Sequence, residues 1–269
     1  MDTTATRSSR AAAWPTIDEV REAARSGTGE GVRVAVIDSG IEATHPRLSQ
    51  LRLRDSVGFE EERGCIRVLE GEGHDIYGHG TAVAGILHEV APLAEVGSFR
   101  VIDAQCSSRT HLICAGVQEA LKRGYHVLNC SFGCRGLAKF ILPHKEWADE
   151  AWLRGSHVVA ACSNLDSRET EWPSHFASVI GVDLAETPSD ALFYRPDHLV
   201  GYAARGENVE VPWLGGGVQF QTGTSFAAPR VAGMIARILS VYPEIRPPMM
   251  HEILSHIAEP WHAGLSSDW

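Results

Sequence analysis

Residues 34–40 read Val-Ala-Val-Ile-Asp-Ser-Gly, an apolar run that ends on an acid, a small residue and a glycine. Consecutive apolar residues, rich in β-branched side chains, indicate a strand buried on both faces, as in a parallel sheet covered by helices. An acid at the carboxyl end of such a strand lies where α/β sheets place their active sites. The same acid is equally an ordinary turn residue, so Asp38 needs support from other parts of the chain before it counts as functional.

Similar runs recur along the chain, and helical patterns separate them. Strands are predicted over residues 32–37, 94–102, 126–130, 157–162 and 178–182. Helices are predicted over residues 81–90, 112–123, 145–154, 225–241 and 249–257. Alternation of this kind favours an α/β fold, in which a mainly parallel β-sheet is flanked by helices on both faces.

The length of 269 residues suits one α/β domain. Residues 1–13, rich in Ala, Thr, Ser and Arg, read as a loose tail, and a Thr-x-x-Glu start predicts a short capped helix over residues 16–24. We therefore expect an N-terminal extension over residues 1–30 and a single domain over residues 31–269.

Charge and hydropathy exclude two classes of partner. The formal net charge is −10 without a cluster of Lys and Arg, which argues against a nucleic acid. The opening residues lack the apolar core of a signal peptide, and no apolar run approaches the roughly 18 residues that span a bilayer. We expect neither a nucleic acid nor a membrane as a partner.

The cysteines indicate a reducing compartment. None of them forms a Cys-x-x-Cys pair, and most stand in apolar strand-like or helix-like surroundings, as reduced core thiols do. A cytoplasmic protein is the simplest expectation. The six residues are Cys65, Cys106, Cys114, Cys130, Cys134 and Cys162.

A second candidate segment reads Tyr-Gly-His-Gly-Thr over residues 77–81, where glycines flank His79 as a helical pattern begins. Glycine at these positions allows other backbone to come close to the imidazole. A single histidine among 13 is more often surface or core filler, so this segment also needs support.

A third segment reads Gly-Thr-Ser-Phe-Ala-Ala-Pro over residues 223–229 and places Ser225 at the start of a helix lined with small residues. Free backbone N–H groups and the positive helix end can stabilise an oxyanion there. The alternative role for a serine so placed is to cap the helix.

The three candidates occur in the chain order Asp38, His79, Ser225, and each fits one role in nucleophilic catalysis. Their segments resemble the Asp, His and Ser signatures of the subtilisin-like serine protease (subtilase) family, and the similarity extends from about residue 32 to residue 239. The resemblance implies a subtilisin-like three-layer α/β/α fold and a peptidase domain over residues 31–269. It also implies that Ser225 attacks the scissile carbonyl, His79 takes and returns the proton, and Asp38 orients the imidazole.

The resemblance also implies the groups around the triad. Asn164 closes a segment similar to the family's oxyanion asparagine, although Cys162 and Ser163 stand where Ala-Gly is usual. The segment of Ser131, Phe132 and Gly133 is similar to the family's Ser-Leu-Gly edge beside the primary specificity pocket. The segment of Cys106, Ser107 and Ser108 aligns less closely with the opposite edge, where relatives often carry glycine. Such edges bind a peptide by adding it as a strand, while plain loop roles stay open for both.

One departure from the family concerns metal. Arg47 stands in a His-Pro-Arg sequence where many relatives have His-Pro-Asp and bind calcium through the acid. A fixed positive charge is no ligand for calcium, so we expect that site to be absent. We assign no metal ligand and no cofactor from the sequence, and calcium at other sites stays open.

Two functions compete. The first is a serine endopeptidase, either a broad digester of unfolded protein or a dedicated intracellular processor of one precursor. Only about thirty residues precede Val32, fewer than the pro-domain of secreted relatives needs, so the chain resembles the intracellular members. Its expected partner is a polypeptide substrate, with a separate inhibitor, chaperone or precursor-peptide protein as a further candidate. The second function is a catalytically silent binding or scaffolding module on the same fold.

Overall fold

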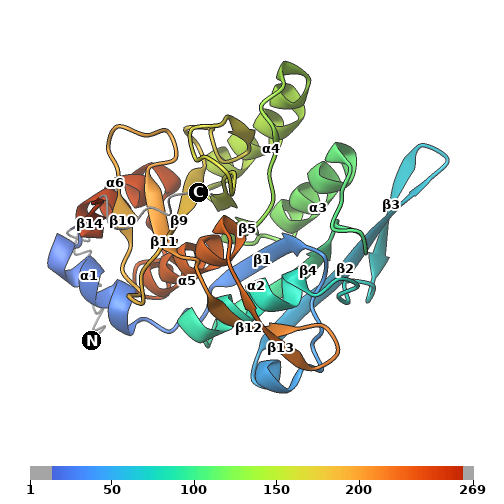
Figure 1. Cartoon of the computed structure of the whole chain (residues 1–269), viewed down its shortest axis with the longest axis horizontal. Helices are drawn as coiled ribbons and strands as arrows, with labels where there is room; N and C mark the ends of the chain where they lie inside the picture. The colour runs from blue at the N-terminus through green and yellow to red at the C-terminus, as the bar shows by residue number, and fades with distance from the viewer. Residues whose placement is uncertain (1–13, 263–269) are drawn as a thin grey trace, which may run out of the picture.

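A ten-stranded sheet runs through the middle of the molecule, with the strand order β14-β10-β11-β9-β7-β5-β1-β4-β2-β3 (Figure 1). The computed structural model describes residues 14–262, so the predicted tail over residues 1–13 lies outside the described residues. The strands of the sheet are β1 (Arg33–Asp38), β2 (Arg52–Glu62), β3 (Cys65–Glu70), β4 (Glu95–Arg100), β5 (Val127–Cys130), β7 (His157–Ala161), β9 (Ile180–Ala185), β10 (Phe193–Tyr194), β11 (Tyr202–Arg205) and β14 (Glu259–Pro260).

The centre of this sheet is parallel. Strands β2, β4, β1, β5, β7, β9 and β11 pair in parallel, and antiparallel pairs occur only toward the two edges, where β3 joins β2 and β10 joins β11. The prediction of a mainly parallel sheet is confirmed, and each predicted strand lies within two or three residues of an observed one. Asp38 is the last residue of β1, so its side chain stands at the carboxyl end of a central strand.

Helices cover both faces, as expected. Helices α1, α2, α5 and α6 lie on one face, and α3 and α4 lie on the other (Figure 1). Strand β1 shows why two cores form: Val34 and Val36 enter one core while Ala35 and Ile37 enter the other. The α-helices are α1 (Ile17–Ser26), α2 (His79–Val90), α3 (Thr110–Lys122), α4 (Ile141–Arg154), α5 (Thr224–Val241) and α6 (Pro247–Ile257), and 3-10 turns occupy Pro46–Leu48 and Ala138–Phe140.

Helix α1 packs against two other helices through its apolar face. Thr16 caps the helix in a reciprocal box with Glu19, as the sequence indicated. Its apolar face carries Val20 and Ala23, and both are buried against α5 and α6. The sequence pattern did not predict this packing, because a short helix with two buried side chains gives little hydrophobic periodicity.

The sequence analysis did not predict two hairpins that the structure contains. Strands β2 and β3 form one that projects from the edge of the sheet, and its outer residues are charged as edge strands often are (Figure 1). Strands β12 (Val209–Trp213) and β13 (Gly217–Gln221) form the other, in which β12 packs on α2 and β13 is mostly exposed. A third small ladder joins β6 (Cys134–Arg135) to β8 (Glu171–Trp172).

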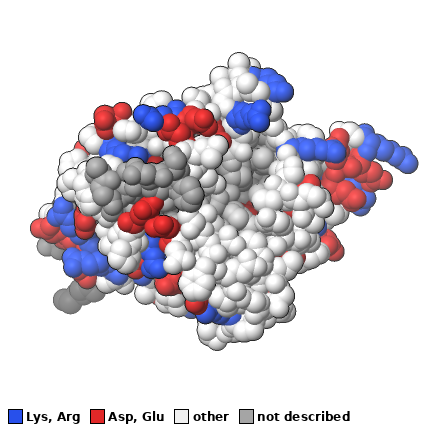
Figure 2. Space-filling model, in the orientation of Figure 1, with Lys and Arg blue, Asp and Glu red and all other residues white. Residues whose placement is uncertain are grey.

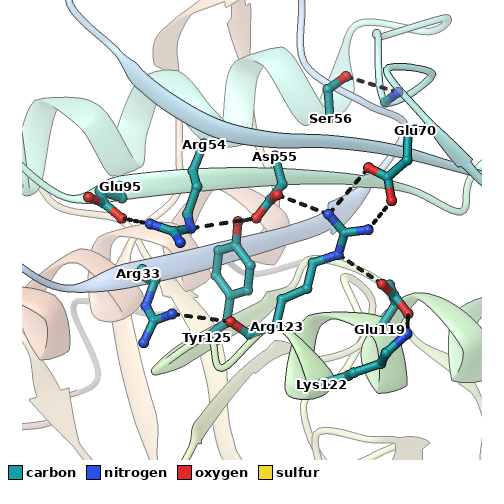
Figure 3. Close-up of polar contacts among 11 residues, drawn as sticks. Arg33, Arg54, Asp55, Ser56, Glu70, Glu95, Glu119, Lys122, Arg123 and Tyr125 are labelled. Atoms are coloured by element: carbon teal, nitrogen blue, oxygen red, sulfur yellow. Dashed lines mark hydrogen bonds and ion pairs between the residues drawn. The ribbon is translucent and has the colours of Figure 1, made fainter.

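A polar network holds the amino ends of the strands together (Figure 3). Arg123, directly after α3, donates from Nη1 to Asp55 Oδ1 of β2 (2.9 Å) and from Nε to Glu119 (2.9 Å). The Tyr125 hydroxyl donates to the other oxygen of Asp55 (2.5 Å). The network lies where β1, β4 and β5 begin, so the opposite end of the sheet, where Asp38 stands, is left for a site.

Between residues 14 and 262, no helix has both the length and the apolar character needed to cross a membrane.

Candidate active site

Asp38 and His79 form a buried pair at the carboxyl end of β1. His79 is the first residue of α2, and its Nδ1 lies 2.8 Å from Asp38 Oδ1 and 3.0 Å from Oδ2. Asp38 is fully buried, and its Oδ1 also accepts the backbone N–H of Ser39 (2.7 Å). A carboxylate in this position holds the imidazole proton on Nδ1 and leaves Nε2 as the proton acceptor.

Two glycines allow α2 to approach the end of β1. A Cβ on Gly80 would lie 2.1 Å from the carbonyl oxygen of Gly40, a distance that no side chain tolerates. Gly40 itself has a φ of +107°, in the region that favours glycine, and a Cβ there would meet the carbonyl oxygen of His74 at 2.3 Å. A larger residue at either position would push His79 away from Asp38.

Asp75 is a second buried carboxylate, and it organises the start of α2. Its Oδ1 accepts the Ser39 hydroxyl (2.8 Å) and the N–H groups of Tyr77 (2.9 Å) and Gly78 (2.8 Å). Its Oδ2 accepts the N–H and hydroxyl of Thr81 (2.9 and 2.5 Å). These are donors that a helix start leaves without partners, and a negative charge there is favourable. Asp75 thereby positions His79. The sequence interpretation treated it as a plain loop residue, although an acid just before a helix start was a usable signal.

The pKa of His79 is shifted by opposing effects. Burial by itself lowers the pKa, but the charge of Asp38, its hydrogen bond and the more distant charge of Asp75 together raise it above the ordinary value of 6.5. The ring also packs against Phe226, the residue after Ser225, with 5.5 Å between the ring centroids. This contact brings the first turn of α5 to the imidazole.

Ser225 is the second residue of α5 and is bound twice to Ser131. Its hydroxyl donates to the Ser131 carbonyl (3.1 Å), and its own carbonyl accepts the Ser131 hydroxyl (3.0 Å). That carbonyl is free because Pro229, four residues later inside the helix, has no N–H to donate to it. In this structure the Ser225 hydroxyl thus faces Ser131, and a rotation about χ1 redirects it; such hydrogen bonds are often looser before substrate binds.

Asn164 presents an amide donor beside Ser225. Its Oδ1 accepts the backbone N–H of Thr224 (2.9 Å) and lies 3.1 Å from the Thr224 hydroxyl. An N–H group donates only, so the oxygen of the amide must face Thr224 and the NH₂ group must point away from it. Gly223 leaves room for this contact, since a Cβ there would lie 3.1 Å from Oδ1.

The two predicted substrate edges differ in the structure. Ser131 holds Ser225 directly, so the edge that it begins lies at the nucleophile. On the other edge, Ser107 donates its N–H to Asp103 Oδ1 (3.0 Å), and its carbonyl accepts the N–H of Asp103 (2.8 Å). Ser108 donates its hydroxyl to the carbonyl of Val101 (2.6 Å). The N–H and the carbonyl of Ser107 are therefore both hydrogen-bonded within a turn, and neither is available to pair with a peptide backbone.

Cys106 lies in the same turn, near Asp38. It has a φ of +56°, unusual for a residue other than glycine, and the following Ser107 is tied back to Asp103. Burial raises the pKa of its thiol, and the charge of Asp38 adds to this effect. The structure thus brings this segment near the site without making it an open strand edge.

Arg47 forms an ion pair with Glu210 of β12. Its guanidinium thus lies in the loop where many relatives place the calcium-binding acid. Within residues 14–262, no three His, Cys, Asp or Glu side chains gather as a metal site requires.

The fold and these groups define a class of protein: an α/β protein in which Asp38 and His79 pair at the carboxyl end of a central parallel strand and a serine stands in the first turn of a helix nearby, an arrangement typical of serine hydrolases. The chain belongs to the Subtilase family (Peptidase S8), whose profile matches residues 29–266. The sequence-based assignment to this family is confirmed.

Comparisons with individual proteins and with a solved structure support the membership of this family. Subtilisin Savinase of Lederbergia lenta is 32% identical over 220 residues, which cover 80% of this chain and 78% of that protein. M-protease of Shouchella clausii is 32% identical over 220 residues, but the chain spans only 55% of its length. A crystal structure of a cold adapted subtilisin-like serine proteinase superposes with a TM-score of 0.70 at 23% identity, covering 86% of this chain and 83% of that one.

Proposed function

We propose that the protein is a serine endopeptidase that hydrolyses peptide bonds through an acyl-enzyme. The observation that carries the proposal is the contact of Asp38 with His79 Nδ1 (2.8 Å), made beside Ser225 at the start of α5. The aspartate orients the imidazole, and a serine stands in the neighbouring helix start, which supports the roles that nucleophilic catalysis requires.

In the proposed mechanism, Ser225 Oγ attacks the carbonyl carbon of the scissile bond while His79 Nε2 takes its proton. Asp38 keeps the imidazole in the required tautomer and stabilises the imidazolium. The oxyanion meets the Asn164 NH₂ group and the backbone N–H of Ser225 at the start of α5, which are in place before the reaction. His79 then gives its proton to the leaving amine, and water repeats the sequence on the acyl-enzyme.

A polypeptide is the substrate class that the surface favours. On the face shown in Figure 2, charges of both signs lie at the rim, whereas the surface over α2, β12 and β13 is mostly uncharged. Such a surface suits pairing with a peptide backbone and lacks the basic track that a nucleic acid needs. We place the activity in a reducing compartment, the cytoplasm, because all six cysteines are free thiols and two of them, Cys130 and Cys162, are buried.

Dedicated processing is the variant of this function that we favour. The Cys106–Ser108 turn has fewer free backbone groups than an open edge, so the substrate must supply more of its binding energy through side chains. We expect slow, limited cleavage of denatured casein and sharp preferences in a peptide library, both read by mass spectrometry. Ser225→Ala protein is the control for contaminating proteases. Rapid cleavage of casein at many sites would exclude dedicated processing and would favour a broad digestive enzyme.

A catalytically silent scaffold is the second candidate. One observation favours it: the Ser225 hydroxyl donates to Ser131 in this structure rather than to His79. Reaction of Ser225 with a fluorophosphonate would exclude this candidate.

Replacing Asn164 tests the oxyanion role. Asn164→Ala is expected to lower kcat by about 10²–10³-fold with little change in KM, the size of effect known for subtilisin itself, because the donor acts on charge that develops only in the transition state. Initial rates on a peptide amide give both constants, and the melting temperature shows whether the fold is intact. A loss of less than about threefold would mean that other donors hold the oxyanion.

A further inference from the structure

Glu171 lies directly against the predicted substrate edge. It belongs to β8, which pairs with β6 immediately after Gly133. A Cβ built on Gly133 would lie 2.4 Å from Glu171 Oε2, so this carboxylate fills the space beside the edge. Gly133 is two residues from Ser131, which holds the nucleophile.

The charge of Glu171 also reaches the segment that ends on Asn164, on the other side of Ser225. Burial raises the pKa of the Cys134 and Cys162 thiols, and the charge of Glu171 adds to both effects. Cys134 follows the edge at Gly133, whereas Cys162 stands two residues before Asn164. Glu171 is therefore close to both segments that flank Ser225.

Glu171 has no cationic partner among the residues that the structure describes. Its side chain is half-buried, and burial and the charge of Glu169 raise its pKa. Arg135 is its cross-strand neighbour but does not come within ion-pair distance, and Arg168 is bound to Asp166 at 2.9 Å. A half-buried carboxylate without a counter-charge is unfavourable, and a cation brought by a ligand would relieve that cost.

The separation from the nucleophile defines which ligand fits. Even a fully extended chain rises about 3.3 Å per residue, so Gly133 lies at most about 7 Å along the chain from Ser131. A lysine or arginine side chain, with its long stem and terminal charge, covers such a distance, and a shorter polar side chain does not. We propose that Glu171 selects substrates with Lys or Arg as the residue whose carbonyl Ser225 attacks. The inference rests on the proposed endopeptidase function and specifies its substrate class.

A set of fluorogenic peptide amides that differ only at this residue tests the proposal. Arg, Lys, norleucine and Leu give a matched series, because norleucine keeps most of the lysine stem without its charge. We expect wild-type kcat/KM to favour Arg and Lys over norleucine by at least about tenfold, and Glu171→Gln to reduce that ratio by at least about tenfold. Arg135→Gln removes the nearest cation on the same ladder and should keep the ratio or increase it.

Binding to Ser225→Ala protein separates this proposal from the proposed function. Fluorescence anisotropy compares a labelled Arg peptide with its norleucine analogue in the presence and absence of Glu171→Gln. A preference for the Arg peptide that depends on Glu171 supports the site even if the wild type cleaves nothing, in which case the endopeptidase function alone fails. An Arg-to-norleucine ratio that Glu171→Gln leaves unchanged, in cleavage or in binding, overturns the proposal while endopeptidase activity stands.

Discussion

Ser225→Ala is expected to abolish reaction with a fluorophosphonate probe and to lower kcat by about 10⁶-fold, the size of effect known for subtilisin itself. The hydroxyl stands in the first turn of α5, directly after Thr224, whose N–H donates to Asn164 Oδ1. Labelling followed by peptide mass spectrometry identifies the modified residue, and hydrolysis of a peptide amide gives the rate.

An exposed serine provides the control for this experiment. Ser49 lies just before β2, and Ser49→Ala should be labelled and should cleave like the wild type. Labelling that persists in Ser225→Ala would assign the nucleophile elsewhere. Well-folded wild-type protein that resists the probe would favour the silent scaffold or a requirement for a partner.

The fold and the family could be predicted, and Asp38, His79 and Ser225 proposed as candidates, because their signals are local. A buried strand that ends on an acid, a histidine between glycines and a serine at a helix start are each visible in a few residues, and their order identifies the family. The sheet followed from β-branched runs between helices. The β2–β3 hairpin was not predicted, because its strands carry many charges and only the middle of β2, around Val57 and Phe59, is buried, so no long apolar alternation marks them.

The groups that support the triad could not be predicted because their roles depend on contacts between distant segments. Asp75 accepts five hydrogen bonds from residues 39–81, a count that only the folded loop reveals. Pro229 has no N–H, so the carbonyl of Ser225 lacks its helical hydrogen bond. The hydroxyl of Ser131, 94 residues away in the chain, donates to that carbonyl instead. Ser107 matched a substrate edge by alignment, yet its backbone is committed to Asp103. Glu171 had no pattern around it, and it gained a role only when the β6–β8 ladder placed it beside Gly133.

Asp38→Asn is expected to lower kcat by about 10⁴-fold, the size of effect known for this replacement in a serine protease of another fold and similar to the loss when the aspartate is removed from subtilisin. An asparagine at this position offers His79 Nδ1 an N–H donor or a neutral oxygen in place of a carboxylate. The proton on the imidazole then shifts to Nε2, which can no longer accept the proton of Ser225. The ground-state contacts change little, so KM should stay close to the wild-type value.

The pH profile distinguishes this electrostatic role from a merely structural one. Catalysis needs neutral His79, and its raised pKa places the acidic limb of wild-type kcat/KM above pH 6.5. Asp38→Asn removes the charge that raises the pKa, while burial continues to lower it, so the limb should move to lower pH. Asp75 acts from farther away, and Asp75→Asn should move the limb in the same direction by less. An acidic limb that stays in place in Asp38→Asn would mean that a group other than His79 controls the rate, and the assignment of the general base would then be wrong.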